Sequence, residues 1–405
     1  MVNTYTDNDK LPVNLANFRM MIASFAVSRI GISSFSIMVL WITLRITGSP
    51  VIAGFADGLF SVPLLFSFLV GTLVDRSMHK KAISIVAMIA RGFSVFLIFL
   101  AAISHIYGVE IFLIYLSVVL VGFTSDVTNS IRSVWFKIFL SEERYQKGSS
   151  IMNGIGSIAE ALGYVLAGVF LFIGTGEGTT ALAIVFLLST IPLIFIRYRD
   201  REIEKTSVSD GLRGGFSFLL KDRFLQEALF LSLIANMSVA MIGIAFTVLV
   251  QEIFHLPAIY LSLVFIAISA GIAAGSLPGA KLRGRLDRIV MPLLLVVGLA
   301  FISVTFIRTV YFLYIPIFVM GAMIGMINPP INSILYKRIP SDIMARIMGL
   351  FNTMALSMTF LSGAIGGVII QLTSSRSLFI VIGILIVACA LVVPLLGEFR
   401  KAVVS

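Results

Sequence analysis

Residues 376–397 read RSLFIVIGILIVACALVVPLLG, and no acidic or basic side chain follows Arg376 within this stretch. An α-helix needs about 20 apolar residues to cross the ~30 Å hydrocarbon core of a bilayer. A transmembrane barrel strand is only about 10 residues long and alternates apolar with polar positions. The length and unbroken apolar character of this stretch therefore predict a membrane-spanning helix.

Apolar runs of similar length recur along the whole chain. Twelve are recognised, at about 16–44, 50–73, 82–104, 109–138, 149–173, 179–198, 223–252, 257–281, 288–307, 311–338, 342–372 and 376–397. Of the 405 residues, 59% are apolar and 12% are charged, whereas a soluble domain carries about 25% charged residues. This composition excludes disorder, a collagen-like structure and a nucleic-acid enzyme. We expect an all-α membrane protein of twelve transmembrane helices whose exterior faces the lipid bilayer.

The basic residues are distributed unevenly between the two sides of these spans. If the N-terminus is cytoplasmic, 24 of the 30 lysines and arginines lie on the cytoplasmic side. Three lie opposite (Arg45, Arg308 and Arg376) and three lie within spans (Arg29, Arg91 and Arg132). Cytoplasmic loops of membrane proteins are rich in Lys and Arg. The asymmetry predicts a multi-pass protein of the cytoplasmic membrane with both termini inside, and it explains the +10 net charge without nucleic acid.

The chain divides into two similar halves. A polar stretch predicts a cytoplasmic linker over 197–222, between six-helix bundles at 1–196 and 223–405. The segment Ile131-Arg132-Ser133 recurs 200 residues later as Ile331-Asn332-Ser333. A parallel repeat of six spans implies a pseudo-two-fold axis along the membrane normal, with the substrate path between the two halves.

Ionisable side chains inside the spans occur only in the first half. They are Arg29, Asp57, Arg91, Asp126, Arg132 and Glu160. Each costs roughly 2.5–3.5 kcal/mol at a helix centre unless it is paired or hydrated. Such residues usually face a bundle interior or a water-filled path. The spans of the second half offer neutral polar groups instead.

Helical spacing places polar residues on single faces of several spans. The residues expected to line a central cavity are Arg29, Ser33, Asn129, Arg132, Asn153, Ser157, Asn236, Asn328 and Asn332. Asp126 and Glu160 lie near the expected midplane, and either is a candidate to carry a coupling proton. The alternative is a structural ion pair with Arg29 or Arg132. Asp57, nearer the outer third of its span, is a third candidate, as part of an outer gate or as a partner of Arg91.

One loop resembles a known motif. The segment Gly71-Thr72-Leu73-Val74-Asp75-Arg76-Ser77-Met78-His79-Lys80-Lys81 resembles the loop between spans two and three of the major facilitator superfamily, with Met78 where that family usually has Gly. Other segments resemble the drug- and macrolide-efflux and enterobactin-exporter branch. They are Asn17-Phe18-Arg19, Arg45-Ile46-Thr47-Gly48-Ser49, Pro63, Pro340 and Arg346-Ile347-Met348-Gly349.

The resemblance implies a gating role for this loop, at Gly71, Asp75, Arg76, Lys80 and Lys81. Asp75 could accept hydrogen bonds from the start of span eleven. The basic residues could pair with Glu142 and Glu143 and hold the cytoplasmic side shut. Anchoring by positive charge alone is the alternative.

The sequence and the resemblance together favour transport over catalysis. No phosphate-binding GxxxxGK[ST] segment is present, and one cysteine with three scattered histidines offers no metal or cofactor site. We therefore expect a monomeric, proton-coupled secondary transporter without cofactor that exports amphipathic small molecules. A transporter for one metabolite or siderophore-like solute, in either direction, is the alternative. An enzyme is not expected.

Overall fold

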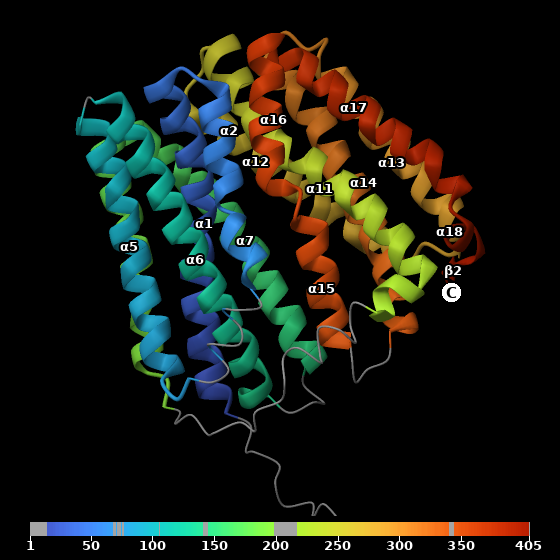
Figure 1. Cartoon of the computed structure of the whole chain (residues 1–405), viewed down its shortest axis with the longest axis horizontal. Coiled ribbons are helices and arrows are strands. Elements are labelled where there is room, and N and C mark those ends of the chain that lie inside the picture. Colours follow the sequence, from blue (N-terminus) through green and yellow to red (C-terminus); the bar gives the residue numbers. More distant parts are fainter. Residues whose placement is uncertain are drawn as a thin grey trace, which may run out of the picture.

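The computed structural model describes residues 14–67, 70, 74, 77–104, 106–140, 145–197, 217–339 and 344–404. Figure 1 shows two groups of helices side by side, one from each half of the sequence. The first half contains α1 (Leu15–Thr47), α2 (Pro50–Leu59), α3 (Val62–Leu65), α5 (Lys80–Ser104), α6 (Tyr107–Phe139), α7 (Tyr145–Ile173), α8 (Thr175–Leu188) and α9 (Thr190–Ile194). The second half contains α11 (Arg223–Val248), η2 (Leu249–Ile253), α12 (Ala258–Gly279), β1 (Gly284–Arg285), α13 (Leu286–Val304), α14 (Val310–Arg338), α15 (Met344–Leu356), α16 (Thr359–Leu372), α17 (Ser375–Val392), η3 (Val393–Leu395), α18 (Gly397–Lys401) and β2 (Val403–Val404).

The all-α membrane fold expected from the sequence is confirmed. In the described part of the chain, 11 helices are long and apolar enough to cross a membrane, and α2 is a shorter apolar helix. The span expected at 50–73 begins with α2, turns at Phe60 and Ser61, and continues as α3. Pro63 explains the interruption, because proline has no amide hydrogen and its ring clashes with the carbonyl four residues earlier, here that of Leu59.

The buried apolar core shows how the halves meet. One large cluster combines residues of both halves, including Phe35 of α1 and Phe246 of α11. It lies at the end of the bundle where α1 finishes and α2 begins, here named the closed end. At the opposite end, here named the open end, the core divides into separate clusters. One surrounds Trp135 in the first half and the other surrounds Phe399 in the second.

Several helix pairs join the halves at the closed end, among them α2 with α16 and α7 with α12. Between α2 and α16 the backbones almost touch, since a β-carbon on Gly54 would overlap the carbonyl oxygen of Gly363, and the reverse is also true. Small residues permit such close helix packing in membranes. Between α7 and α12 the rings of Tyr164 and Phe265 lie 5.3 Å apart. These contacts close one end of the space between the halves.

The C-terminal residues pack against the open end of the second half. Phe399 of α18 is fully buried and stacks on Phe224, with ring centroids 5.1 Å apart. Glu227 of α11 accepts hydrogen bonds from the backbone N–H groups of Glu398 and Phe399, and Arg338 of α14 donates to Glu398 at 2.8 Å. The strand β2 pairs antiparallel with β1, between α12 and α13. This segment therefore ties together the open-end termini of several helices.

Candidate functional site

A three-residue polar cluster joins α1 to α7 within the first half. The guanidinium of Arg29 donates a 2.6 Å hydrogen bond to Oε2 of Glu160, and the hydroxyl of Tyr164 donates a 2.8 Å bond to Oε1. Tyr164 lies one helical turn after Glu160, so the two side chains share a face of α7. Both carboxylate oxygens of Glu160 are thus bonded, and the Arg29–Glu160 pair has no net charge.

This cluster lines a cavity of about 180 Å³ between α1, α2, α6 and α7. The lining residues are Arg29, Ile32, Ser33, Phe35, Ser36, Val39, Ala56, Asp57, Phe60, Val118, Glu160 and Tyr164. The predicted cavity residues Arg29 and Ser33 and the predicted proton-carrying residues Asp57 and Glu160 come together here. Tyr164 was not among the predicted site residues, although its position four residues after Glu160 is a sequence signal that could have identified it.

Asp57 lies on a wall of this cavity that borders the second half. Among the described residues its carboxylate has no hydrogen-bond or ion-pair partner. A β-carbon on Gly243 of α11 would lie 3.3 Å from its Oδ2, so the carboxylate rests against the opposite half. An unpaired carboxylate enclosed by protein is costly while it is charged. Asp57 is therefore an ionisable side chain at the interface between the two halves.

Asp126 lies apart from this cluster. The hydroxyl of Ser67 donates a 2.6 Å hydrogen bond to its Oδ1, and its Oδ2 is buried without a partner in the described part of the chain. The ion pairs with Arg29 or Arg132 considered from the sequence are not seen for this residue. The structure therefore separates Asp126 from Glu160, which holds the arginine.

The two other arginines inside the spans have neutral partners. Arg91 is fully buried and donates to the hydroxyls of Ser28, Thr124 and Thr128. Asp57, for which pairing with Arg91 was one of two alternatives from the sequence, does not contact it. Three well-placed hydroxyls instead replace the water around this guanidinium, which indicates a structural role.

Arg132 lies with Asn129 on the open-end part of α6. Its guanidinium donates a 2.5 Å hydrogen bond to Oδ1 of Asn129 and lies over the ring of Phe25, 4.2 Å from the centroid. Asn129 is exposed. Asn153 and Ser157 of α7 are likewise exposed, and the hydroxyl of Ser157 donates to the carbonyl of Asn153.

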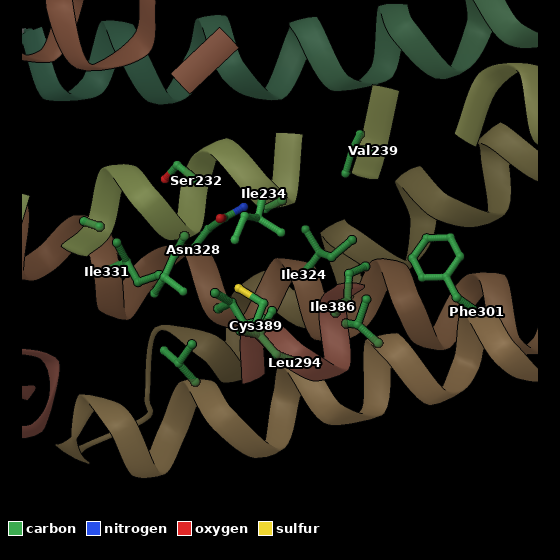
Figure 2. A pocket seen from close by; sticks show the side chains of 16 residues that line it. Ser232, Ile234, Val239, Leu294, Phe301, Ile324, Asn328, Ile331, Ile386 and Cys389 are labelled. Atoms are coloured by element: carbon green, nitrogen blue, oxygen red, sulfur yellow. The ribbon is translucent and has the colours of Figure 1, made fainter. Parts of the chain in front are cut away.

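The second half supplies a different surface. Asn328 and Asn332 of α14 are exposed, and Asn236 of α11 donates a 2.8 Å hydrogen bond to the carbonyl of Ser232 on its own helix. Beside them lies a cavity of about 150 Å³ between α11, α13, α14 and α17 (Figure 2). Its lining residues are Ala228, Leu231, Ser232, Ile234, Ala235, Val239, Val290, Leu294, Val297, Phe301, Ile324, Ile327, Asn328, Ile331, Ile386 and Cys389.

Part of the predicted gating loop can be located. Gly71, Asp75 and Arg76 lie outside the described residues. Lys80 donates to the carbonyl of Ser77, and Lys81 donates to the carbonyls of Ile194 and Ile196 at 2.7 and 2.8 Å. Lys81 thus holds the end of α9 within its own half. Glu142 and Glu143, its expected partners, also lie outside the described residues.

The described residues contain no cluster of three or more His, Cys, Asp or Glu side chains that could hold a metal ion. The chemistry that this arrangement offers is therefore ion pairing, hydrogen bonding and proton binding at carboxylates. Each of these can change when the halves move relative to each other.

Comparisons with known proteins agree with this architecture. The family model described as Major Facilitator Superfamily matches residues 21–363. A mutant form of the nucleoside transporter NupG superimposes with a TM-score of 0.75 at 12% identity, covering 94% of this chain and 100% of that chain. An auto-inhibited peptide transporter of the POT family has a TM-score of 0.73 at 11% identity, covering 94% and 96%.

A POT family transporter in complex with 5-aminolevulinic acid also has a TM-score of 0.73, at 13% identity, covering 95% of this chain and 96% of that chain. No curated protein sequence matches the chain. At these identities the likeness to solved structures shows the fold alone. The family match in turn points to a transporter rather than an enzyme.

Proposed function

The chain belongs to the major facilitator superfamily, whose members are secondary transporters, and on that premise we propose that it exports amphipathic small molecules in exchange for protons. The observation that carries the proposal is the Arg29–Glu160–Tyr164 cluster, beside the unpaired Asp57, in a cavity at the surface where two halves meet. Alternating access would open this cavity first to one side of the membrane and then to the other.

The charge distribution supports an orientation with the open end in the cytoplasm. At the closed end, Arg45 lies in the last turn of α1, Arg376 in the first turn of α17, and Arg308 between α13 and α14. Lys81, Lys281 and many other basic residues lie at the open end. By the positive-inside rule, the open end and both chain termini would be cytoplasmic. One copy of the chain, with bundles at 1–196 and 223–405 joined by the linker at 197–222, would form the transport unit.

The carboxylate of Glu160 would couple the binding of a proton to the binding of a solute. This carboxylate can be neutralised either by Arg29 or by a proton, and the two compete for the same oxygen. When a proton binds, Arg29 loses its counter-charge and becomes available to a polar group of the solute. Because each state favours different partners, proton binding and solute binding become coupled.

Asp57 offers a second link, to the movement of the halves. Its carboxylate rests against α11 while α2 packs against α16. Separation of those helices would change the surroundings of this carboxylate. Proton binding at Asp57 would then be coupled to the arrangement of the halves. Asp126, with one oxygen buried and unpartnered, is the third candidate carrier.

The test is substrate-dependent proton flux in proteoliposomes, screened across dyes, macrolides and siderophores. Glu160→Gln, Asp57→Asn and Asp126→Asn are compared with Glu177→Gln, a change at an exposed carboxylate of α8. We expect at least one of the first three variants to lose pH-gradient-driven accumulation while still binding solute, and Glu177→Gln to retain it. If all three still concentrate solute in response to a pH gradient, these carboxylates do not carry the proton. Flux with one siderophore or metabolite alone would favour a dedicated transporter.

A further inference from the structure

The apolar cavity in the second half lies apart from the charged cluster and is lined almost entirely by hydrocarbon. Ser232 and Asn328 are the two hydrogen-bonding side chains other than the thiol of Cys389 among its lining residues. Figure 2 shows Ser232 and Val239 on one side of the cavity and Leu294 and Cys389 on the other. Val297, Phe301 and Cys389 are at most 5% exposed, so they form its inner part.

The mouth of this cavity faces the first half. Ala235 and Val239 are exposed lining residues of α11, and Gly243 follows at the next helical turn on the same face. A β-carbon on Gly243 would contact Leu40 and Asp57 of the first half. The face of α11 that borders the cavity is therefore the face turned toward the charged cluster. On α14, Asn328 is exposed at the same cavity.

The volume sets the size of the occupant. A cavity of about 150 Å³ lined by Leu, Ile and Phe stays dry and accepts one benzene molecule. The cavity here has the same volume of about 150 Å³ and a similar lining. The Asn328 amide has no hydrogen-bond partner among the described residues, so it can bond to a polar atom next to such a ring.

We propose that this cavity is a recognition subsite for a single aromatic ring, or an apolar group of that size, on a solute whose polar part reaches the Arg29–Glu160 cluster. The proposal rests on the proposed transport function and adds the chemical class of the solute. The two halves would then recognise different parts of one molecule, with hydrocarbon bound by α11, α13, α14 and α17. A charged or sugar-like solute without an apolar ring would leave this cavity empty.

The single cysteine of the chain makes the cavity directly measurable. Benzyl methanethiosulfonate reacts with a thiolate to form a mixed disulfide, releasing methanesulfinate, and the thiol proton passes to water. Modification of Cys389 by this reagent is followed by intact-protein mass, beside the charged 2-sulfonatoethyl methanethiosulfonate. We expect the benzyl reagent to modify Cys389 at least ~10-fold faster than the charged one, because only the apolar ring partitions into hydrocarbon.

A filled cavity provides the decisive comparison. Val297→Phe places a ring inside the cavity, whereas Val296→Phe places the same ring on the neighbouring residue, which is 39% exposed on the outer face of α13. Val297→Phe should slow benzyl modification by about tenfold or more, and Val296→Phe should leave it unchanged. Ala235→Phe, at the exposed mouth, serves the same purpose if Val297→Phe does not fold. Equal reaction rates in filled and unfilled proteins would overturn the proposal.

A binding measurement connects the cavity to solute recognition. Radiolabelled tetraphenylphosphonium, whose arms are single phenyl rings, is titrated into detergent-solubilised protein. The filled variants should raise its dissociation constant at least ~10-fold relative to Val296→Phe, and an unchanged constant would overturn the subsite. Neither measurement uses a gradient. A failure here therefore rejects the subsite alone, while the proteoliposome assay separately judges proton-coupled export.

Discussion

The two halves of this molecule share a helical plan and differ in chemistry. Arg132 on α6 and Asn332 on α14 occupy corresponding positions of the repeat, and one carries a charge while the other does not. The first half has a cavity with an ion pair and Asp57. The second has a cavity lined by hydrocarbon. The difference shows that a repeated helical fold can enclose an ion pair in one copy and a hydrocarbon-lined cavity in the other.

The largest effect should come from breaking the joint that holds the halves together. Gly54→Leu introduces a side chain where even a β-carbon overlaps the carbonyl oxygen of Gly363. Overpacking costs about 1–3 kcal/mol, which corresponds to roughly a 5- to 150-fold change in the closed population. Transport in proteoliposomes should fall accordingly, and cysteine-accessibility labelling should show the closed end opened.

Gly154→Leu is the matched control for that substitution. A β-carbon on Gly154 meets nothing within 4 Å, and the residue lies on the open-end part of α7. This variant should transport at the wild-type rate. If Gly54→Leu does the same, the packing of α2 on α16 does not limit the movement of the halves.

A smaller effect is expected from breaking the ion pair of the first half. Arg29→Gln leaves Glu160 with Tyr164 as its remaining partner in the described part of the chain. The side chains of the pair are 41% and 29% exposed, so solvent screens part of the interaction. We expect a loss of about 1–2 kcal/mol in unfolding free energy. Thermal unfolding in detergent measures it.

The double variant Arg29→Gln/Glu160→Gln sharpens this test. Removing both partners leaves no uncompensated charge, so the pair of changes should destabilise the protein less than the sum of the single changes. Strictly additive losses would show that the two side chains do not interact in solution.

Arg132 and Asn332 occupy corresponding positions of the repeat, and exchanging their residue types tests whether only the first half tolerates a charge at this position. Arg132→Asn removes the hydrogen bond to Asn129 and the contact with the ring of Phe25. A cation–π contact contributes about 0.5–1 kcal/mol at exposed sites, so a modest drop in melting temperature is expected. Asn332→Arg, at an exposed position, should leave the melting temperature unchanged. A strong destabilisation by Asn332→Arg would mean that the second half excludes charge on structural grounds.

The smallest effect concerns the C-terminal segment of the second half. The pKa of the Glu398 carboxyl lies below its ordinary value of 4.5, because Arg338 and then Lys401 donate hydrogen bonds to it. A carboxyl whose pKa is lower in the folded state than in the unfolded state stabilises the fold at pH values above its unfolded-state pKa. This stabilisation is lost as the pH falls through the folded-state pKa. Glu398→Gln should therefore lower stability at pH 7, by about 0.2–1 kcal/mol, and by less near pH 3. A difference that grows on acidification would contradict this assignment.

The helices were largely predictable from sequence, because membrane burial requires a minimum apolar length. The run expected at 109–138 is α6, Tyr107–Phe139, and the run at 149–173 is most of α7, Tyr145–Ile173. The break after Leu59 was not predicted, since the apolar character of the sequence continues through it. Pro63 is the local signal that accounts for it.

The polar partners were less predictable than the helices. Helical spacing assigned Arg29 and Glu160 to inward faces, and in the structure both line one cavity. Spacing contains no information about how far one helix slides along another. The relative axial positions of neighbouring helices determine that Arg29 pairs with Glu160 and not with Asp126. They also determine that Arg91 donates hydrogen bonds to three hydroxyls. Of the lining of the apolar cavity in the second half, Asn328 was a predicted cavity residue. The apolar lining residues were not foreseen, because they are indistinguishable in sequence from those that face lipid.

The neutrality of the Arg29–Glu160 pair has a consequence for the membrane voltage. A group without net charge can move across the membrane field without electrical work. Moving one elementary charge through 100 mV costs about 2.3 kcal/mol. If a proton replaces Arg29 on Glu160, as proposed above, the cluster would gain one positive charge, and only then would its reorientation depend on voltage. The proton-loaded and proton-free forms of the protein would thus respond differently to the same membrane potential.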